Sequence, residues 1–244
     1  MMFETYGGIF AAGDGTRLQA AFPGVPKPLV PVAGVPLIVW AARQLSAAGA
    51  KEITVLLNSA GKSARERLKK EFPEGKFTFI VKNTKTSYES FRLLSQALAQ
   101  KSDGFVLSAV DTLCSPADLR EFAVFSHESK FDAVLGITDK IEDEKPLWAD
   151  VDEKGRITAL GEKAAKKIYA TSGVYYVTRR LAEEMPDASE YKALRHYLSD
   201  IVSQGKAVGS AYMPQSVDVD DAADVPLAEA FAKKHFLTQG EQHD

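Results

Sequence analysis

The sequence is poor in the residues that build disulfides and thiol or imidazole metal centres. Its 244 residues include one cysteine, Cys114, and four histidines scattered along the chain. A single cysteine excludes an internal disulfide and a cysteine-rich metal site. It is also typical of a reducing compartment, so we expect a cytoplasmic protein. No Gly-x-Ser-x-Gly segment is present, which disfavours a serine hydrolase.

The chain also lacks a large charge imbalance and long apolar runs. It has 30 Lys and Arg against 33 Asp and Glu, a net charge of -3. A broad nucleic-acid-binding surface is therefore not expected, and any anion site must be local. No apolar run approaches membrane-spanning length, and no charged-then-apolar leader opens the sequence. The expected partners are small molecules, with no nucleic acid and no membrane, and the sequence leaves the oligomeric state open.

Apolar runs alternate with amphipathic stretches for most of the length. A helix is predicted over 36–48, because Leu37, Trp40 and Leu45 recur at helical spacing and Gly49 follows as a C-terminal cap. The other predicted helices cover 62–71, 87–100, 116–128, 189–203 and 221–235. The predicted strands cover 7–12, 52–57, 77–81, 104–109, 131–137, 148–152, 156–160, 171–177 and 206–212.

This order of elements predicts the fold class. Strands that alternate with helices over short links indicate an α/β protein with a mostly parallel mixed sheet and helices on both faces. Strands around 140–170 form a small insertion. We expect one domain over residues 1–236, followed by a polar tail over 237–244.

Two blocks near the start predict a phosphate-binding site. The first reads Ala-Ala-Gly-Asp-Gly-Thr-Arg-Leu over 11–18, and the second begins Pro-Lys-Pro at 26–28. Glycines allow the backbone to approach a phosphate closely, and turn amides point at it. Arg17 adds a planar donor fork that suits phosphate oxygens, and flanking prolines stiffen the loop that presents Lys27. A dinucleotide fingerprint would need a small residue where Leu18 stands.

The two blocks resemble the signature of the nucleotidyltransferase family that includes the sugar-1-phosphate nucleotidylyltransferases. That signature reads roughly Ala-Ala-Gly-x-Gly-Thr-Arg-Leu, then a variable loop, then Pro-Lys-Pro-Leu-x-Pro-Val. Both blocks match it in order and spacing. The resemblance implies a single Rossmann-like, glycosyltransferase-A-like domain that uses Mg²⁺, with Arg17 and Lys27 as its catalytic residues.

Carboxylates follow two of the apolar runs. Asp111 comes directly after the run 105–110, and Asp218 and Asp220 follow a later one. If 216–220 is extended, Asp218 and Asp220 point to the same side. Magnesium prefers oxygen ligands and usually takes one or two carboxylates plus substrate phosphates. The resemblance implies that Asp111 and Asp218 bind the metal ion, with Asp220 as a co-ligand.

The resemblance also assigns the remaining site residues. The nucleotide-binding positions are Ala11, Ala12, Gly13, Asp14, Gly15, Thr16, Asn83, Thr86 and Ser87. The substrate-binding positions are Glu162 for sugar hydroxyls, Lys163 for the acceptor phosphate, and Gly173 for the space beside the sugar. The residues alone allow other interpretations, because Thr86 and Ser87 are equally suited to cap a helix and Glu162-Lys163 to form a solvated charged patch.

The resulting hypothesis is an Mg²⁺-dependent transfer of a nucleoside monophosphate from a nucleoside triphosphate to a phosphorylated acceptor. The acceptor is expected to be a sugar 1-phosphate, with pyrophosphate as the second product and nucleotide sugar biosynthesis as the setting. Two alternatives keep Arg17, Lys27 and the aspartates: a cytidylyltransferase acting on phosphocholine or a polyol phosphate, and an enzyme with a molybdopterin acceptor. A third alternative, a non-catalytic nucleotide-binding module, is disfavoured because the set of Arg17, Lys27, Asp111 and Asp218 is intact. A glycosyltransferase is disfavoured, because its Asp-x-Asp would stand where the chain reads Asp111-Thr112-Leu113.

Overall fold

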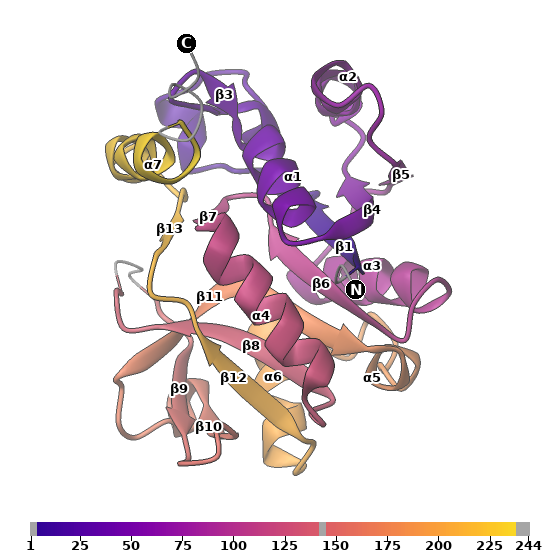
Figure 1. Cartoon of the computed structure of the whole chain (residues 1–244), viewed down its shortest axis with the longest axis vertical. Coiled ribbons are helices and arrows are strands. Elements are labelled where there is room, and N and C mark those ends of the chain that lie inside the picture. The colour runs from indigo at the N-terminus through magenta and orange to yellow at the C-terminus, as the bar shows by residue number, and fades with distance from the viewer. Residues whose placement is uncertain (1–3, 142–144, 238–244) are drawn as a thin grey trace.

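The computed structural model describes residues 4–141 and 145–237, and its centre is a mixed sheet of nine strands (Figure 1). Seven strands form one continuous order: β10 (Ile157–Leu160), β9 (Trp148–Val151), β11 (Tyr169–Thr178), β6 (Gly104–Ala109), β1 (Thr5–Ala11), β4 (Ala50–Leu57) and β5 (Phe77–Val81). Two further strands, β8 (Ala133–Thr138) and β12 (Val208–Tyr212), extend from β11.

The sheet has a parallel half and a mixed half. Strand β1 pairs in parallel with β4 and β6, and β4 pairs in parallel with β5. Strand β11 runs antiparallel to both β6 and β8. The parallel strands are nearly continuous apolar runs, because helices cover both of their faces. Their carboxyl ends therefore meet at one edge, where ligands bind in open α/β sheets.

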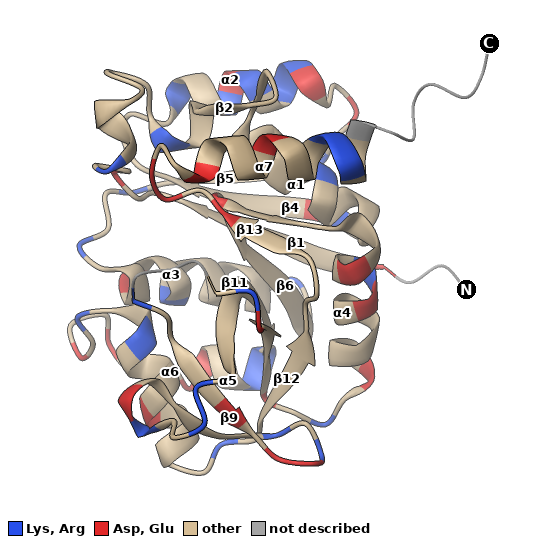
Figure 2. Cartoon of the chain, turned by 90° about the vertical axis from the view of Figure 1, so that its left-hand side faces the viewer, with Lys and Arg blue, Asp and Glu red and all other residues tan. Residues whose placement is uncertain are grey.

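Helices pack on both faces of this sheet (Figure 2). One core contains buried side chains from α1 (Leu37–Ala47), α2 (Lys62–Glu71), α4 (Pro116–Glu128) and α7 (Asp224–Ala232). The other contains side chains from α3 (Ser87–Ala99), α5 (Arg179–Glu183) and α6 (Leu194–Ser203). The predicted α/β class, the mostly parallel mixed sheet and the two covered faces are confirmed, and β9 with β10 forms the small strand insertion.

Two predicted helices differ from the observed ones. The helix predicted over 189–203 begins only at Leu194, because residues 187–193 form a loop whose end is fixed by a hydrogen bond from the Leu194 amide to Ser87 Oγ. The helix predicted over 221–235 is α7 followed by a π-helical turn, Lys233–Leu237. Apart from Leu237, the predicted polar tail lies outside the described residues. Across the described chain, no helix has the length and apolar character needed to cross a membrane.

Short strands that the sequence did not predict complete the site edge. Strand β7 (Thr112–Cys114) pairs antiparallel with β13 (Ser216–Asp218), and the pairing sets Asp218 opposite Thr112. A second small pair joins β2 (Pro31–Val32) and β3 (Val35–Pro36). The Gln44 side chain of α1 is fully buried and bonds both ends of β7, donating to the Thr112 carbonyl (2.9 Å) and accepting from the Cys114 amide (3.1 Å). The strand that follows Asp111 is thus fixed to the core.

Candidate active site

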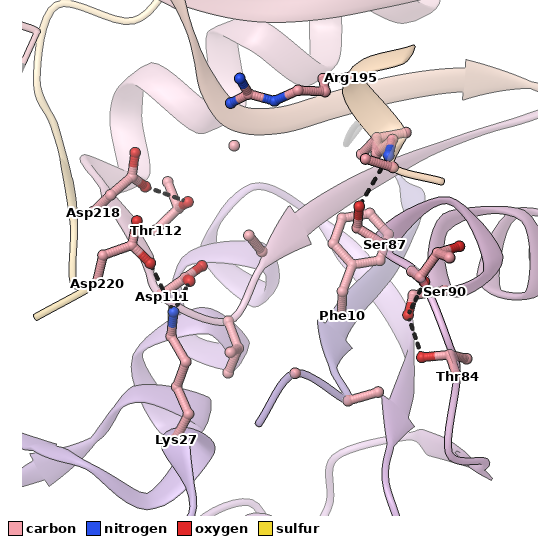
Figure 3. Close-up of a pocket in the computed structure, with 18 of the residues that line it drawn as sticks. Phe10, Lys27, Thr84, Ser87, Ser90, Asp111, Thr112, Arg195, Asp218 and Asp220 are labelled. Carbon is pink, nitrogen blue, oxygen red and sulfur yellow. Dashed lines mark hydrogen bonds and ion pairs between the residues drawn. The ribbon is translucent and has the colours of Figure 1, made fainter. Parts of the chain in front are cut away.

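A cavity of about 540 Å³ opens beyond the carboxyl ends of β1 and β6 (Figure 3). Residues 12–15, which follow β1, line one side of the cavity, and residues 109–112, at and after the end of β6, line another. The other lining residues are Phe10, Lys27, Thr84, Lys85, Thr86, Ser87, Ser90, Leu147, Thr171, Gly173, Tyr175, Ala193, Leu194, Arg195, Leu198, Asp218 and Asp220. This location agrees with the rule that ligands bind beyond the carboxyl ends of the strands in open α/β sheets.

The turn after β1 has the geometry of an anion site. Gly15 has a φ of +59°, and an added Cβ there would lie 2.5 Å from Lys27 Cβ, so only glycine allows the lysine stem to pass so close. Within the described chain, the backbone amides of residues 13–16 donate no hydrogen bond to another group. Unpaired amides at a glycine turn are donors suited to phosphate oxygens.

Lys27 lies between two carboxylates at the cavity wall. It begins the 3₁₀ helix Lys27–Leu29, and its side chain is 11% exposed. Its Nζ forms ion pairs with Asp111 and with Asp220 Oδ1, the latter at 2.9 Å. Burial alone would lower the pKa of Lys27, but the two carboxylates outweigh it and raise the pKa above its ordinary value. The Lys27 ammonium is therefore positively charged at neutral pH.

Arg17 joins this group of charges from the outside. Its guanidinium pairs with Asp220 Oδ2 at 3.1 Å, and its side chain is 56% exposed. Burial acts to raise the pKa of Asp220, but Lys27 and Arg17 together hold that pKa below its usual range. Arg17 lines a smaller pocket beside the main cavity and reaches the site through Asp220. Both predicted catalytic cations thus meet at one carboxylate.

Asp218 lines the same cavity, on the strand that pairs with β7. Its Oδ1 accepts a hydrogen bond from Thr112 Oγ1 at 2.6 Å. Burial, together with the nearby Asp111 carboxylate, raises the pKa of Asp218 to about 8. Gly173 faces this pair with a φ of +71°, and a Cβ there would lie 2.2 Å from Thr112 Oγ1. Glycine therefore provides the space in which Thr112 and Asp218 meet.

The carboxylates fit a divalent cation by their chemistry. The Asp111 carboxylate is close enough to disfavour the charge of Asp218, and a dication relieves that repulsion. Within the described residues, no three His, Cys, Asp or Glu side chains are grouped to hold a metal ion. Magnesium needs only one or two carboxylates when phosphates supply the other oxygens. Asp111 and Asp218 are thus the residues that could hold it, whereas Asp220 is paired with Lys27 and Arg17.

Of the nucleotide-binding positions predicted at 83, 86 and 87, two line the cavity and one does not. Thr86 lines the cavity and also caps α3, accepting from the Glu89 amide at 3.0 Å, while Ser87 lines the cavity and accepts from the Leu194 amide at 2.9 Å. Asn83 does not line the cavity. Its Oδ1 accepts from the Ser59 amide at 2.8 Å, so this side chain joins two neighbouring loops.

Glu162 and Lys163 do not line the main cavity. They line a second cavity of about 530 Å³, which shares Leu147 and Arg195 with the first. Lys163 Nζ donates to Ser203 Oγ at 2.8 Å. Among the residues of the first block, Ala12, Gly13, Asp14 and Gly15 line the main cavity. Ala11 is a buried strand residue, and Thr16 is exposed and does not line the cavity.

Sequence reasoning missed the wall opposite Lys27. Arg195 lies across the cavity in the first turn of α6 (Figure 3), where it also donates to the Lys145 carbonyl at 2.8 Å. Beside it, Leu194 and Leu198 give this wall an apolar surface. The only sequence signal was the predicted helix, and its start was predicted five residues too early to show that Arg195 lies in the first turn. Tyr175, on β11, lines the same space, and its pKa is raised mainly by burial.

Solved nucleotidyltransferase structures share this fold. The inositol-1-phosphate CTP transferase from T. maritima superposes with a TM-score of 0.79 over 94% of this chain and 97% of that one. The two sequences are 23% identical. At that identity the likeness concerns the fold alone.

The family model described as the MobA-like NTP transferase domain matches residues 7–175, and the chain belongs to this family. A 2-aminoethylphosphonate cytidylyltransferase from Lancefieldella rimae is 29% identical over 80% of this chain and 78% of that protein. A CMP-5'-(3-aminopropyl)phosphonate synthase from Streptomyces rubellomurinus is 26% identical over 88% of this chain. The chain spans 35% of the length of that synthase. The chain thus contains a nucleotidyltransferase-family domain, as the sequence predicted.

Proposed function

We propose that this enzyme transfers a cytidylyl group from CTP to a small phosphonate or phosphate-ester acceptor and releases pyrophosphate. The observation that carries the proposal is the cluster in which Lys27 lies between Asp111 and Asp220, beside a glycine turn with unpaired amides. Such a group combines cations for a triphosphate with carboxylates for a metal ion in one cavity.

In the reaction, an acceptor oxygen forms a bond to the α-phosphorus of the triphosphate. The bridging bond to the β-phosphate breaks, and its electron pair leaves with pyrophosphate. A phosphate monoester has a second pKa of about 6, so the attacking oxygen is largely ionised and needs no general base. The protein therefore contributes positioning and charge neutralisation.

The residues divide this work between the two substrates. Lys27, Arg17 and the amides of residues 13–16 neutralise and orient the triphosphate. Asp111 and Asp218 would hold Mg²⁺, which supplies charge neutralisation at the reacting phosphates when bound. Arg195, on the opposite wall, offers a guanidinium to the anionic group of the acceptor.

CTP is proposed as the donor because both related proteins described above carry cytidylyl or CMP chemistry in their names. Lys85 in the cavity also departs from the glycine of the sugar-nucleotide signature. The apolar Leu147, Leu194 and Leu198 suit the short carbon chain of an alkylphosphonate. A sugar 1-phosphate is the second candidate, and Gly173, which lines the cavity without a side chain, is the observation that favours it.

The test is pyrophosphate release with each of the four ribonucleoside triphosphates against a panel of acceptors. The panel contains 2-aminoethylphosphonate, 3-aminopropylphosphonate, inositol 1-phosphate, phosphocholine and several hexose 1-phosphates. We expect release that requires CTP, a phosphonate or phosphate-ester acceptor and Mg²⁺ together, and that stops with EDTA. Release only with a hexose 1-phosphate would establish the second candidate, and binding of nucleotide without release from any pair would refute both.

A further inference from the structure

The charges of the site neutralise one another in the ligand-free protein. Lys27 pairs with both Asp111 and Asp220, and Arg17 pairs with Asp220. Two cations thus face two carboxylates. Lys27 is 11% exposed and Asp111 is 20% exposed, so neither charge can rely on bulk water if its partner is removed. Of the groups expected to bind metal and triphosphate, Lys27, Arg17 and Asp111 are therefore already paired with charges of the site, whereas Asp218 accepts a hydrogen bond from Thr112.

A single ligand can serve as counter-ion either to the carboxylates or to the cations of this group, but not to both. A free divalent cation at Asp111 would lie beside the Lys27 ammonium, and two positive charges at such short range repel strongly. A free triphosphate would attract Lys27 and Arg17 and leave Asp111 and Asp220 without counter-ions in a partly buried site. A metal–nucleotide complex satisfies both halves, because it brings positive charge to the carboxylates and negative charge to the cations.

We infer that Lys27 makes the enzyme select the preformed metal–nucleotide complex over either component alone, by acting as the resident counter-ion of Asp111, one of the two carboxylates that would hold the metal ion. The inference rests on the proposed function only in taking such a complex as the donor. It gives Lys27 a second role besides neutralising the triphosphate.

The primary test measures binding of free Mn²⁺ by electron paramagnetic resonance, without nucleotide. Manganese is used as the probe because it favours the same carboxylate ligands as magnesium. Lys27→Met keeps the length of the side chain and removes its charge, so it should bind free Mn²⁺ at least tenfold more tightly than the wild type. Adding Asp111→Asn to this variant should abolish the gain and so locate the ion.

The matched control is Lys101→Met, which removes a lysine paired with Glu52 near the opposite end of β4. It should change Mn²⁺ affinity less than twofold. An unchanged affinity in Lys27→Met, an equal gain in Lys101→Met, or a gain that survives Asp111→Asn would overturn the inference. Circular dichroism checks each variant, and Lys27→Gln replaces Lys27→Met if the latter does not fold.

A measurement on the wild type keeps the inference testable without any variant. Ligands that bind the folded state raise the melting temperature by mass action. CTP with Mg²⁺ should raise it clearly, whereas Mg²⁺ alone and CTP with EDTA should each leave it nearly unchanged. A shift from Mg²⁺ alone equal to that from the pair would overturn the inference. These readouts need no turnover, so a protein that fails the pyrophosphate assay can still pass them, and the two failures are distinguishable.

Discussion

Gln44 provides a test of how the fold holds the acidic edge of the site. Its side chain is fully buried on α1 and makes three hydrogen bonds, to Ser108 Oγ (3.1 Å), the Thr112 carbonyl (2.9 Å) and the Cys114 amide (3.1 Å). The change Gln44→Leu keeps the approximate volume and removes all three. The Thr112 carbonyl and the Cys114 amide would then lack this buried partner.

The magnitude follows from those two backbone groups. Each buried polar group left unsatisfied costs about 1–3 kcal/mol, so the pair costs roughly 2–6 kcal/mol. The apolar leucine recovers about 1–2 kcal/mol by its burial. We therefore expect the free energy of unfolding to fall by about 3 kcal/mol, which for a chain of this size is about 6–12 °C in melting temperature.

The assay combines thermal melting with pyrophosphate release. Because Gln44 fixes both ends of β7, its loss should also lower kcat at a temperature where the variant is still folded. The matched control is Gln96→Leu on α3, a partly exposed position where the change should stay within about 0.5 kcal/mol. A loss below about 1 kcal/mol in Gln44→Leu, or an equal loss in the control, would refute the reasoning.

Three other predictions follow from single contacts. Gly173→Ala places a Cβ 2.2 Å from Thr112 Oγ1 at a φ of +71°, so it should lower both the melting temperature and kcat, and normal values of both would contradict this. Arg195→Gln should raise the KM for the acceptor at least tenfold and leave the KM for CTP within twofold; equal effects on both would argue against an acceptor role. The pKa of Glu52 is lowered, chiefly by its bond from Lys101, so this pair stabilises the fold above the unfolded-state pKa of about 4.5 and loses its effect as acid protonates Glu52. Glu52→Gln should therefore lower the urea midpoint at pH 7 and leave it nearly unchanged at pH 3, and a difference that persists at pH 3 would contradict the assignment.

The local sequence determined a large part of this protein. The alternation of buried strands and amphipathic helices depends on residues close in the chain, so the α/β class and most element bounds could be predicted. The glycine turn at 13–15 and the proline-flanked Lys27 are equally local, because backbone freedom and stiffness belong to the residues themselves. Asp111 could be placed near the site because it directly follows β6.

Only the tertiary structure decided which of these groups meet. Asp218 lies opposite Thr112 through pairing of β13 with β7, and a partner 106 residues away has no local signature. The direction of side chains after a strand or at a helix start is likewise set by packing, so Arg195 enters the cavity while Asn83 turns to another loop. The resemblance of the sequence assigned Glu162 and Lys163 to substrate binding, but in the folded chain they line the neighbouring cavity. The sequence thus supplied the chemical groups, and long-range pairing, which is fixed by the core as a whole, determined their distances.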